Sequence, residues 1–519
     1  MKYFIPAWYS SHHWWESKAE PFYYKYAETA FDDMISLMSM HRQNKHPFGL
    51  IVLNYTPDLR TFLHRQELFS TDYWSVFDHI QGFTDKMPTA IDYRQLDWPE
   101  GTELMYLPYM VRALMPDNQH ANVHFNEEGY VIWIEVFHTD IQRYRYILDD
   151  RGYVSGVVYF DDAGTAYCQR YMTAMGDWIL QEDLITQTVH VNTHYQDTFE
   201  LSQYPTMEAV VFEFLIAYRD AKMAEADAVI VAADERDNEV LADIFEQQSL
   251  CVSVFHQREQ LSTEDVTVMG HEVKWLVDTL ENERLLTSYL GEQGAAQRLM
   301  RITPFDAQMM PNMSSQLYET YIGVWLDGLE TDTAINVLAQ LEGYLAQDTA
   351  LRVVLLTEQR INTLDAAIQQ EVVRVNAAMN RTDDMSEAVA DLIEVQPPTE
   401  YVEIKHVPFE MDIIEAITTL RIVIDLSQEP DLFLQICCLS AGLPQINRRE
   451  TDYVTHGLNG HVLTAADDLH NALDYYLMQL KNWNQSYAYA MKLAKKYASD
   501  NIIAQLDTLI EGEKDGATV

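Results

Sequence analysis

The sequence is poor in basic residues and in cysteine. Its 519 residues hold 35 Lys and Arg against 80 Asp and Glu, which gives a formal net charge of −45. Such a charge repels nucleic acid, anionic lipid and phosphate-bearing substrates unless a local basic patch intervenes, so we expect no nucleic-acid partner. The four cysteines include one adjacent pair, Cys437 and Cys438, but no CxxC or Cys/His metal spacing. This pattern favours a reducing compartment.

Long apolar runs and several enzyme motifs are also missing. The first residues, MKYFIPAWYSSHHWW, contain no apolar h-region, and no run of 18 apolar residues occurs in the sequence. We therefore expect a cytoplasmic protein that reaches a membrane only through partners. No Gly-x-Ser-x-Gly elbow and no Walker loop is present, so the sequence gives no support to a hydrolase or an NTPase.

Strand-like and helix-like blocks alternate at both ends of the chain. YFIPAWY, YYKYAETAFDDMISLMSMH and FGLIVLNY predict a strand, a helix and a buried strand, which is a βαβ beginning and implies a parallel sheet. From about residue 120 the pattern changes to short strands. Asp149–Gly152 and Asp161–Gly164 predict hairpin loops in which glycine takes the left-handed position. The last 200 residues return to alternating strands and helices.

These blocks predict an α/β protein with two Rossmann-like domains and an antiparallel β-meander inserted in the first. Ligands of such folds bind outside the carboxyl ends of the strands, near the cleft between the domains. The expected segments are the N-terminal Rossmann-like domain (1–115 and 206–296), the inserted β-sheet domain (116–205), the C-terminal Rossmann-like domain (297–480) and the C-terminal helices (481–519).

In the C-terminal third, the strand RIVIDLS is followed by Glu429, by Gly442 and Pro444 in one turn, and by the Asn459-Gly460 turn. In this order the motifs resemble the second domain of retaining glycosyltransferases of the GT-B fold. In that family a strand leads to a Glu-x7-Glu pattern, a small-Gly-x-Pro turn and later an Asn-Gly turn before a helix. Here the strand RIVIDLS leads to the first acid, and HGLNGHVLTAADDLHNALDYYL follows. The resemblance implies a nucleotide-sugar pocket of which only remnants are left. The residues at its positions are Glu429, Cys437, Gly442, Pro444, Asn459 and Gly460.

The cations that would hold a nucleotide diphosphate are absent from this pocket. In active members of the family an Arg and a Lys follow the first strand of the second domain, but no base occurs between Arg301 and Arg352. Asp327, Glu330 and Asp332 stand in that turn instead. Each unscreened like-charge contact at ~4 Å opposes binding of a phosphate by roughly 1–4 kcal/mol.

The start of the following helix is expected to be equally unsuited to phosphate. Pro430 at the first helical position would remove an amide donor, and Asp431 would place a negative charge at the positive end of the helix dipole. Cys437 takes the place of the second Glu, which would bind the ribose. We expect Cys437 and Cys438 to be small buried hydrophobic residues. The pocket is therefore predicted to have no catalytic residues and no cofactor.

Further stretches extend over the whole chain, namely FIPAWY, YRQLDWPEGTEL, the DDRG and DDAG turns, and ITPFD at 302–306. Through them the chain is similar over its full length to a narrower family, the first accessory secretory proteins of the Gram-positive accessory Sec system. It implies a GT-B-like pseudoenzyme that binds two sister accessory secretory proteins and helps deliver a glycosylated serine-rich adhesin to the accessory SecA motor and SecY channel. The alternative is an active cytosolic retaining glycosyltransferase, or its non-catalytic subunit, which Glu429 and the Asn-Gly turn support.

Aromatic residues gather in and after the first predicted β–α turn. Trp8, Tyr9, Trp14 and Trp15 could contact a glycan or a partner, because aromatic faces stack on sugar rings. We favour core packing instead, since Trp and Tyr dominate cores as well. The adjacent His12-His13 is expected to point its two rings apart, so we predict no metal site.

Overall fold

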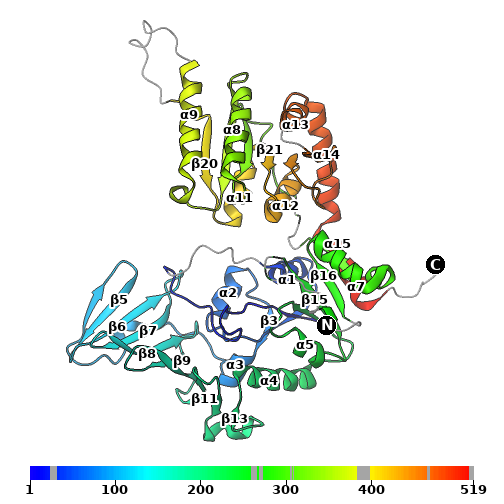
Figure 1. Cartoon of the computed structure of the whole chain (residues 1–519). Coiled ribbons are helices and arrows are strands. Elements are labelled where there is room, and N and C mark those ends of the chain that lie inside the picture. Colours follow the sequence, from blue (N-terminus) through cyan, green and yellow to red (C-terminus); the bar gives the residue numbers. More distant parts are fainter. Residues whose placement is uncertain are drawn as a thin grey trace. The chain divides into compact units, whose positions relative to one another are not determined.

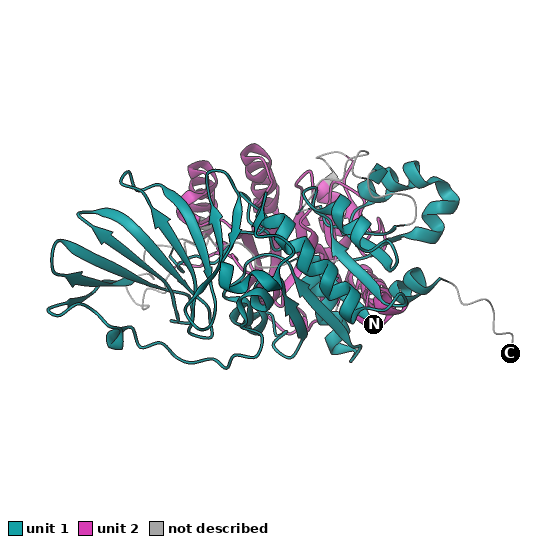
Figure 2. Cartoon of the chain, turned by 90° about the horizontal axis from the view of Figure 1, so that it is seen from below, with its two compact units in different colours: residues 1–304, 505–519 teal, residues 305–504 magenta. Residues whose placement is uncertain are grey.

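A computed structural model describes most of the chain, with residues 1–23, 32–256, 258, 266–267, 273–303, 307, 309–382, 398–464 and 468–512 placed. The chain forms two compact units. Unit 1 comprises residues 1–304 and 505–519, and unit 2 comprises residues 305–504, coloured separately in Figure 2. Among the described residues, no helix combines the length and the apolar character needed to span a membrane.

A seven-stranded parallel sheet forms the core of unit 1, in the order β17-β16-β15-β14-β1-β2-β3. The interior strand β14 (AVIVA) is buried along its whole length, as expected when helices cover both faces of a parallel sheet. The other strands are β1 (Lys2–Ile5), β2 (Phe48–Val52), β3 (Asp72–Ser75), β15 (Ser249–Val254), β16 (Lys274–Val277) and β17 (Leu299–Arg301), and β14 is Ala228–Ala232.

Helices connect these strands. The first, α1, starts at a side-chain cap, because Asp32 accepts a hydrogen bond from the Ile35 amide. The helices of unit 1 are α1 (Asp33–Gln43), α2 (Leu59–Arg65), α3 (Val76–Gln81), α4 (Met207–Lys222), α5 (Asn238–Ile244) and α7 (Leu280–Arg298), with part of α15 (Ser499–Glu511).

An antiparallel sheet of ten strands lies between α3 and α4 in the chain and runs in sequence order from β13 to β4 (Figure 1). The predicted hairpin glycines are confirmed, with φ of 88° at Gly152 and 78° at Gly164. The strands are β4 (Glu103–Tyr106), β5 (Met110–Met115), β6 (Gln119–Phe125), β7 (Val131–His138), β8 (Ile141–Leu148), β9 (Val154–Phe160), β10 (Ala166–Met172), β11 (Trp178–Asp183), β12 (Val189–Val191) and β13 (Gln203–Tyr204).

The antiparallel sheet starts earlier than the change of sequence pattern suggests. Its first two strands precede residue 116, where the insertion was predicted to begin. Strand β4 (ELMY) is mostly exposed, so it lacks the alternation of buried and exposed positions by which a half-buried strand is recognised.

A six-stranded parallel sheet forms the core of unit 2, in the order β20-β19-β18-β21-β22-β23. Side chains of α8, α9 and α13 share one buried cluster with this sheet, and side chains of α11 and α12 share another, so both faces are covered. The strands are β18 (Thr320–Trp325), β19 (Leu351–Thr357), β20 (Val402–His406), β21 (Leu420–Asp425), β22 (Gln445–Asn447) and β23 (Gly460–Val462).

The strand order of unit 2 reverses between β18 and β21, which makes this pair the topological switch point of the sheet. The helices are α8 (Thr331–Leu345), α9 (Ala366–Thr382), α11 (Glu410–Ile417), α12 (Leu432–Ala441), α13 (Asp468–Leu477), α14 (Leu480–Lys496) and the start of α15. A short 3-10 turn lies at Ile361–Thr363, and unit 1 has two more at Tyr93–Gln95 and Thr193–Thr198.

Two parallel sheets with flanking helices, and an antiparallel sheet inserted in the first unit, agree with the expected α/β class. The predicted first helix is present as α1, while residues 24–31 of that prediction lie outside the described residues. Residues 304–306 of the ITPFD stretch also lie outside them. The division at residues 115, 205, 296 and 480 stays a prediction.

Candidate functional site

The loop between β21 and α12 holds the remnants of the predicted pocket. The carboxylate of Asp425 binds backbone amides of this loop and fixes its conformation. Asp425 is 3% exposed, and it accepts hydrogen bonds from the Ser427 amide at 3.0 Å and from the Asp431 amide at 2.8 Å. Burial raises the pKa of Asp425, against the lowering effect of these hydrogen bonds. The loop therefore satisfies its own amides with a protein carboxylate.

Helix α12 begins with Asp431 as its N-cap, and the Asp431 side chain accepts a hydrogen bond from the Leu434 amide at 2.7 Å. The prediction that Pro430 occupies the first helical position was wrong, because Pro430 precedes the cap. The conclusion about phosphate is unchanged, since a capping carboxylate engages the helix amide and brings negative charge to the helix start.

Glu429 and Cys437, which take the places of the two acids, lie in opposite environments. The Glu429 side chain is 77% exposed and forms an ion pair with Arg449. Cys437 is 1% exposed, and burial, followed by the neighbouring Cys438, raises the pKa of its thiol well above the usual value. Gln435 is no substitute for the missing acid, because its amide already contacts Pro430 O at 3.1 Å and the Thr451 hydroxyl at 2.6 Å.

Gly442 and Pro444 have structural roles that need no ligand. Gly442 ends α12 with a φ of 73°, and a Cβ there would lie 2.3 Å from the ring of Tyr487. Because glycine has no Cβ, α14 can approach α12 closely at this position. Pro444 continues toward β22, and its carbonyl accepts a hydrogen bond from the Val423 amide at 3.1 Å.

Asn459 and Gly460 form a closed turn. Asn459 is fully buried. Its side chain accepts a hydrogen bond from the Thr455 amide at 2.8 Å and donates one to the Tyr453 carbonyl at 2.6 Å. A Cβ at Gly460 would lie 2.5 Å from Gln445 O, in the neighbouring strand. Both residues are thus accounted for by packing and hydrogen bonding within unit 2.

Carboxylates line the same edge of the sheet. Asp327, after β18, accepts hydrogen bonds from Thr357 Oγ1 at 2.9 Å and from the Glu358 amide at 2.6 Å. Burial, followed by the charges of Asp431 and Asp327, raises the pKa of Glu358 to about 7. Burial, followed by the charge of Glu358, also raises the pKa of Glu410 to about 7. An anionic diphosphate is repelled wherever these groups are ionised.

Glu358 and Glu410 were not predicted from the sequence. Glu358 directly follows β19, and Glu410 opens α11 after β20. An acid placed straight after a buried strand was the available signal, because the carboxyl ends of parallel strands meet at one edge of a sheet.

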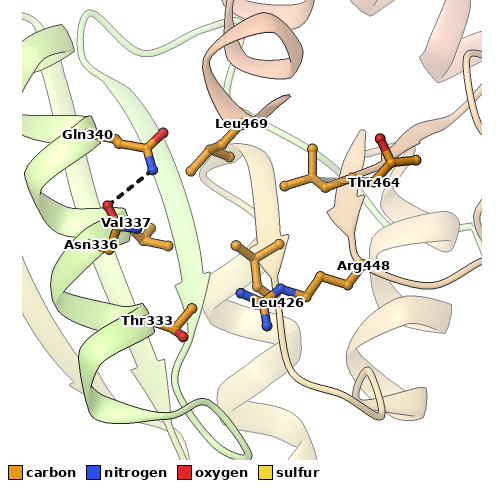
Figure 3. Close-up of a pocket in the computed structure, with 9 residues that line it drawn as sticks. Thr333, Asn336, Val337, Gln340, Leu426, Arg448, Thr464 and Leu469 are labelled. Atoms are coloured by element: carbon orange, nitrogen blue, oxygen red, sulfur yellow. Dashed lines mark hydrogen bonds between the residues drawn. The ribbon is translucent and has the colours of Figure 1, made fainter. Parts of the chain in front are cut away.

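A cavity of about 340 Å³ lies on the α8 side of unit 2 (Figure 3). One face of α8 and the residues following β21, β22 and β23 line it. Among the residues that line the cavity, only Arg448 carries a formal charge, and its guanidinium is exposed. Within the described residues it has no ion-pair or hydrogen-bond partner. The cavity has room for a small polar molecule with one anionic group. The lining residues are Thr333, Asn336, Val337, Gln340, Leu426, Arg448, Leu463, Thr464 and Leu469.

The aromatic residues of the first β–α turn are packed in unit 1. Tyr9, Trp14 and Trp15 are 3–5% exposed, and Trp8 is half-buried. Their polar atoms reach carboxylates that sit on other elements: Trp8 contacts Asp32, Tyr9 contacts Asp237, Trp14 contacts Glu208 and Trp15 contacts Glu182. This is the packing that the sequence analysis favoured, and a glycan contact at these residues stays a prediction.

The expectation for His12 and His13 was wrong. Their ring centroids lie 4.1 Å apart, because residues 11–16 form bends and a turn and not an extended strand in which neighbouring side chains alternate. Glu16 joins them, and one ligand atom from each of the three residues lies within 4.8 Å of the others. Glu16 did not enter the sequence analysis, although its spacing from His12 places it one turn away.

Comparison with known proteins gives matches over nearly the whole chain. The family model of accessory Sec system protein 1 matches residues 1–512. The accessory Sec system protein 1 of Staphylococcus aureus (strain NCTC 8325 / PS 47) is 43% identical over 516 residues, which cover 99% of this chain and all of that protein.

Solved structures extend the comparison to the fold. A chain of the crystal structure of accessory secretory protein 1, 2 and 3 in Streptococcus pneumoniae is similar with a TM-score of 0.82 and 26% identity, covering 98% of this chain and 99% of that one. The pneumococcal O-GlcNAc transferase GtfA, solved in complex with UDP and GlcNAc, gives a TM-score of 0.67 at 11% identity, with 98% of each chain covered. The predicted GT-B-like fold is confirmed.

Proposed function

The chain belongs to the family of accessory Sec system protein 1, and from this premise we propose that it is a non-catalytic, glycosyltransferase-like component of the accessory Sec export complex. It binds two sister accessory secretory proteins and helps deliver a glycosylated serine-rich adhesin to the accessory SecA motor and SecY channel. It does so in the cytoplasm and meets the membrane only through that translocase.

The observation that carries the non-catalytic role is the acidic edge of the unit 2 sheet. Asp327, Glu358, Glu410 and Asp425 stand there, and within the described residues no Lys or Arg forms an ion pair with any of them. A transferase that holds a diphosphate leaving group without a metal needs cations or free helix amides at this place. The amides of the β21–α12 loop are engaged by Asp425 and Asp431.

The partner role is supported by the relatives. The similar chain from Streptococcus pneumoniae was solved together with accessory secretory proteins 2 and 3, and it aligns with nearly all of this chain. The strongly negative charge of −45 favours protein partners over nucleic acid or anionic lipid.

The second candidate is an active retaining glycosyltransferase, or the non-catalytic subunit of one, that modifies the same adhesin. The observation in its favour is Glu429, which reaches solvent at the position of the first family acid and forms an ion pair with Arg449. The likeness to the O-GlcNAc transferase GtfA supports the fold of this candidate and not its activity.

Isothermal titration calorimetry of the full chain with UDP-GlcNAc separates the two candidates. We expect no saturable binding up to millimolar ligand, while a UDP-GlcNAc-dependent transferase of the same fold, run in parallel, binds. Micromolar binding that is lost in Glu429→Ala and kept in Glu450→Ala, an exposed acid on the loop after β22, would overturn the non-catalytic proposal.

Co-purification tests the partner half independently. The untagged chain, co-expressed with its two sister accessory secretory proteins, is expected to elute with them in one size-exclusion peak. Separate elution of all three proteins would contradict the proposed complex, whatever the calorimetry gives.

A further inference from the structure

Three side chains with metal-ligating atoms converge on the turn after β1. Nδ1 of His12 lies 3.4 Å from Oε2 of Glu16, and His13 completes a group whose ligand atoms all lie within 4.8 Å of one another. When ligand atoms sit about 2.0–2.1 Å from a tetrahedral ion, neighbouring ligand atoms are about 3.4 Å apart. The His12–Glu16 distance already has this value, and the ligand atom of His13 lies no more than 4.8 Å from the other two.

The turn that carries these residues is held in place by its neighbours. The indoles of Trp14 and Trp15 are buried and donate to Glu208 at 3.2 Å and to Glu182 at 3.0 Å. The backbone is fixed as well, since the Glu16 amide donates to His13 O at 3.0 Å and the Tyr55 amide donates to Trp15 O at 2.9 Å. Ordered backbone from His13 to Glu16 lowers the entropy that binding an ion would otherwise cost.

His13 also has the second contact that metal-bound histidines use to fix their ring. Its imidazole stacks on Trp15, with centroids 4.9 Å apart and planes 6° from parallel. The side-chain nitrogen Nε2 of Gln187, in the turn after β11, lies 3.3 Å from Nε2 of His13. A 180° flip of this amide brings its oxygen to the same place, where it accepts the Nε2 proton and leaves the lone pair of Nδ1 for a metal.

The ligand types indicate the class of ion. Two imidazoles and one carboxylate suit Zn²⁺ and similar divalent transition metals, whereas Mg²⁺ and Ca²⁺ prefer oxygen ligands alone. We propose that His12, His13 and Glu16 bind one divalent transition metal ion of the Zn²⁺ class, with a fourth position open to water or to a partner's side chain. The 74% exposure of the His12 side chain leaves that fourth position accessible.

Binding of Zn²⁺ to the untagged full chain tests the proposal directly. Calorimetry is done with excess Mg²⁺ present, because Mg²⁺ occupies the many surface carboxylates that would otherwise bind Zn²⁺ weakly. One saturable site per chain is expected. His12→Ala and His13→Ala should each weaken it by more than ~10-fold, and Gln187→Ala, which removes only the outer contact, by roughly 10-fold or more.

A second pair of histidines provides the matched control. His456 and His461 have ring centroids 4.5 Å apart but belong to no group of three metal-ligating side chains found among the described residues. The variant His456→Ala/His461→Ala should bind Zn²⁺ as the wild type does. Co²⁺ in place of Zn²⁺ adds a spectroscopic readout, since visible d–d bands of tetrahedral strength should appear in the wild type and vanish in His12→Ala.

Three results would overturn the proposal. They are the absence of saturable Zn²⁺ binding, an affinity that is unchanged in both His12→Ala and His13→Ala, and an equal loss in the His456→Ala/His461→Ala control. His12 is exposed, so His12→Ala decides the question even where a substitution at the half-buried His13 disturbs folding.

Discussion

The two units place acidic residues in opposite surroundings. In unit 1, Arg60 and Arg151 pair with Asp78, Asp149 and Asp150, and the Arg151 side chain is almost fully buried. In unit 2, the acids at the sheet edge have no such arginines among the described residues, and burial raises the pKa of Glu358 and Glu410 to about 7. Unit 1 therefore uses buried ion pairs to join its parts, whereas the acidic sheet edge of unit 2 repels anions.

Unit 1 depends on its arginine network for stability. Arg151 donates to Asp149 at 2.7 Å, to Asp78 at 2.7 Å and to Phe83 O at 2.7 Å, which ties the inserted sheet to α3. Arg151→Met leaves two buried carboxylates with one partner fewer, so we expect a loss of about 3–5 kcal/mol in the free energy of unfolding. Urea denaturation followed by circular dichroism measures it.

The control for this prediction is an arginine at the surface of unit 2. Arg374 pairs with Glu342 and Glu371 while 49% of its side chain is exposed, so Arg374→Met should cost less than about 1 kcal/mol. Equal losses for the two variants would remove the contrast between the units.

The acidic edge makes the stability of unit 2 depend on pH. Folded Glu358 and Glu410 keep their protons up to a pKa of about 7, whereas the same groups ionise near 4.5 in the unfolded chain. Between these values the folded state binds more protons, so the stability of unit 2 falls as pH rises from about 4.5 to about 7 and then levels off.

Neutral replacements should remove this dependence. In Glu358→Gln/Glu410→Gln, we expect Tm at about pH 8 to rise slightly above the wild type, and the difference to close at about pH 5. The rise is small because Glu358 is exposed and Glu410 is only partly buried, so solvent screens their charges. Thermal unfolding across this pH range measures both. Glu403→Gln/Glu415→Gln removes two exposed acids of the same unit as a control. A Tm difference that stays constant with pH would contradict the raised pKa values.

The smallest expected effect concerns the caps of two helices, one in each unit. Asp431→Ala removes the N-cap of α12 and should cost about 1 kcal/mol in the free energy of unfolding, whereas Asp431→Ser keeps a capping oxygen and should cost less. Because the charge of Asp431 raises the pKa of Glu358, either change should also move the pH profile of unit 2 toward lower pH.

The control for this prediction is the N-cap of α4 in unit 1, which is uncharged. There the Thr206 side chain accepts a hydrogen bond from the Ala209 amide. Thr206→Ala should cost a similar free energy at every pH in the same urea titrations. A pH-dependent loss at Thr206, or a pH-independent one at Asp431, would show that charge at the cap is not the cause.

Most of the architecture could be predicted from the sequence, because hydrophobic periodicity and turn glycines depend on residues that are close together in the chain. The buried run at β2 and the left-handed Gly152 and Gly164 follow from residues that are neighbours in the chain. Strand β4 was not predicted, because an exposed edge strand does not alternate between buried and exposed positions. His12 and His13 were misjudged because their side-chain directions depend on a turn that the buried Trp14 and Trp15 hold.

The candidate site was predictable only in part, for a similar reason. Glu429, Gly442 and Pro444 lie close together in the chain and follow one strand, so their spacing identified them. Glu358 and Glu410 are about 50 residues apart and meet through the order of strands in the sheet, which no local spacing encodes. Pro430 was placed too far into α12, an error at a helix boundary, where one or two residues are difficult to assign.

The helix α15 has a consequence for how the protein is made. Its second half belongs to unit 1, where Lys2 pairs with Asp507, and Ser249 and Lys274 donate to Ile510 O. A ribosome completes the seven-stranded sheet of unit 1 long before it reaches these residues. At about 5–20 residues per second, the synthesis of unit 2 intervenes for a time on the order of tens of seconds. Over that interval the nascent chain carries a nearly finished unit 1 whose last helix has not yet been translated.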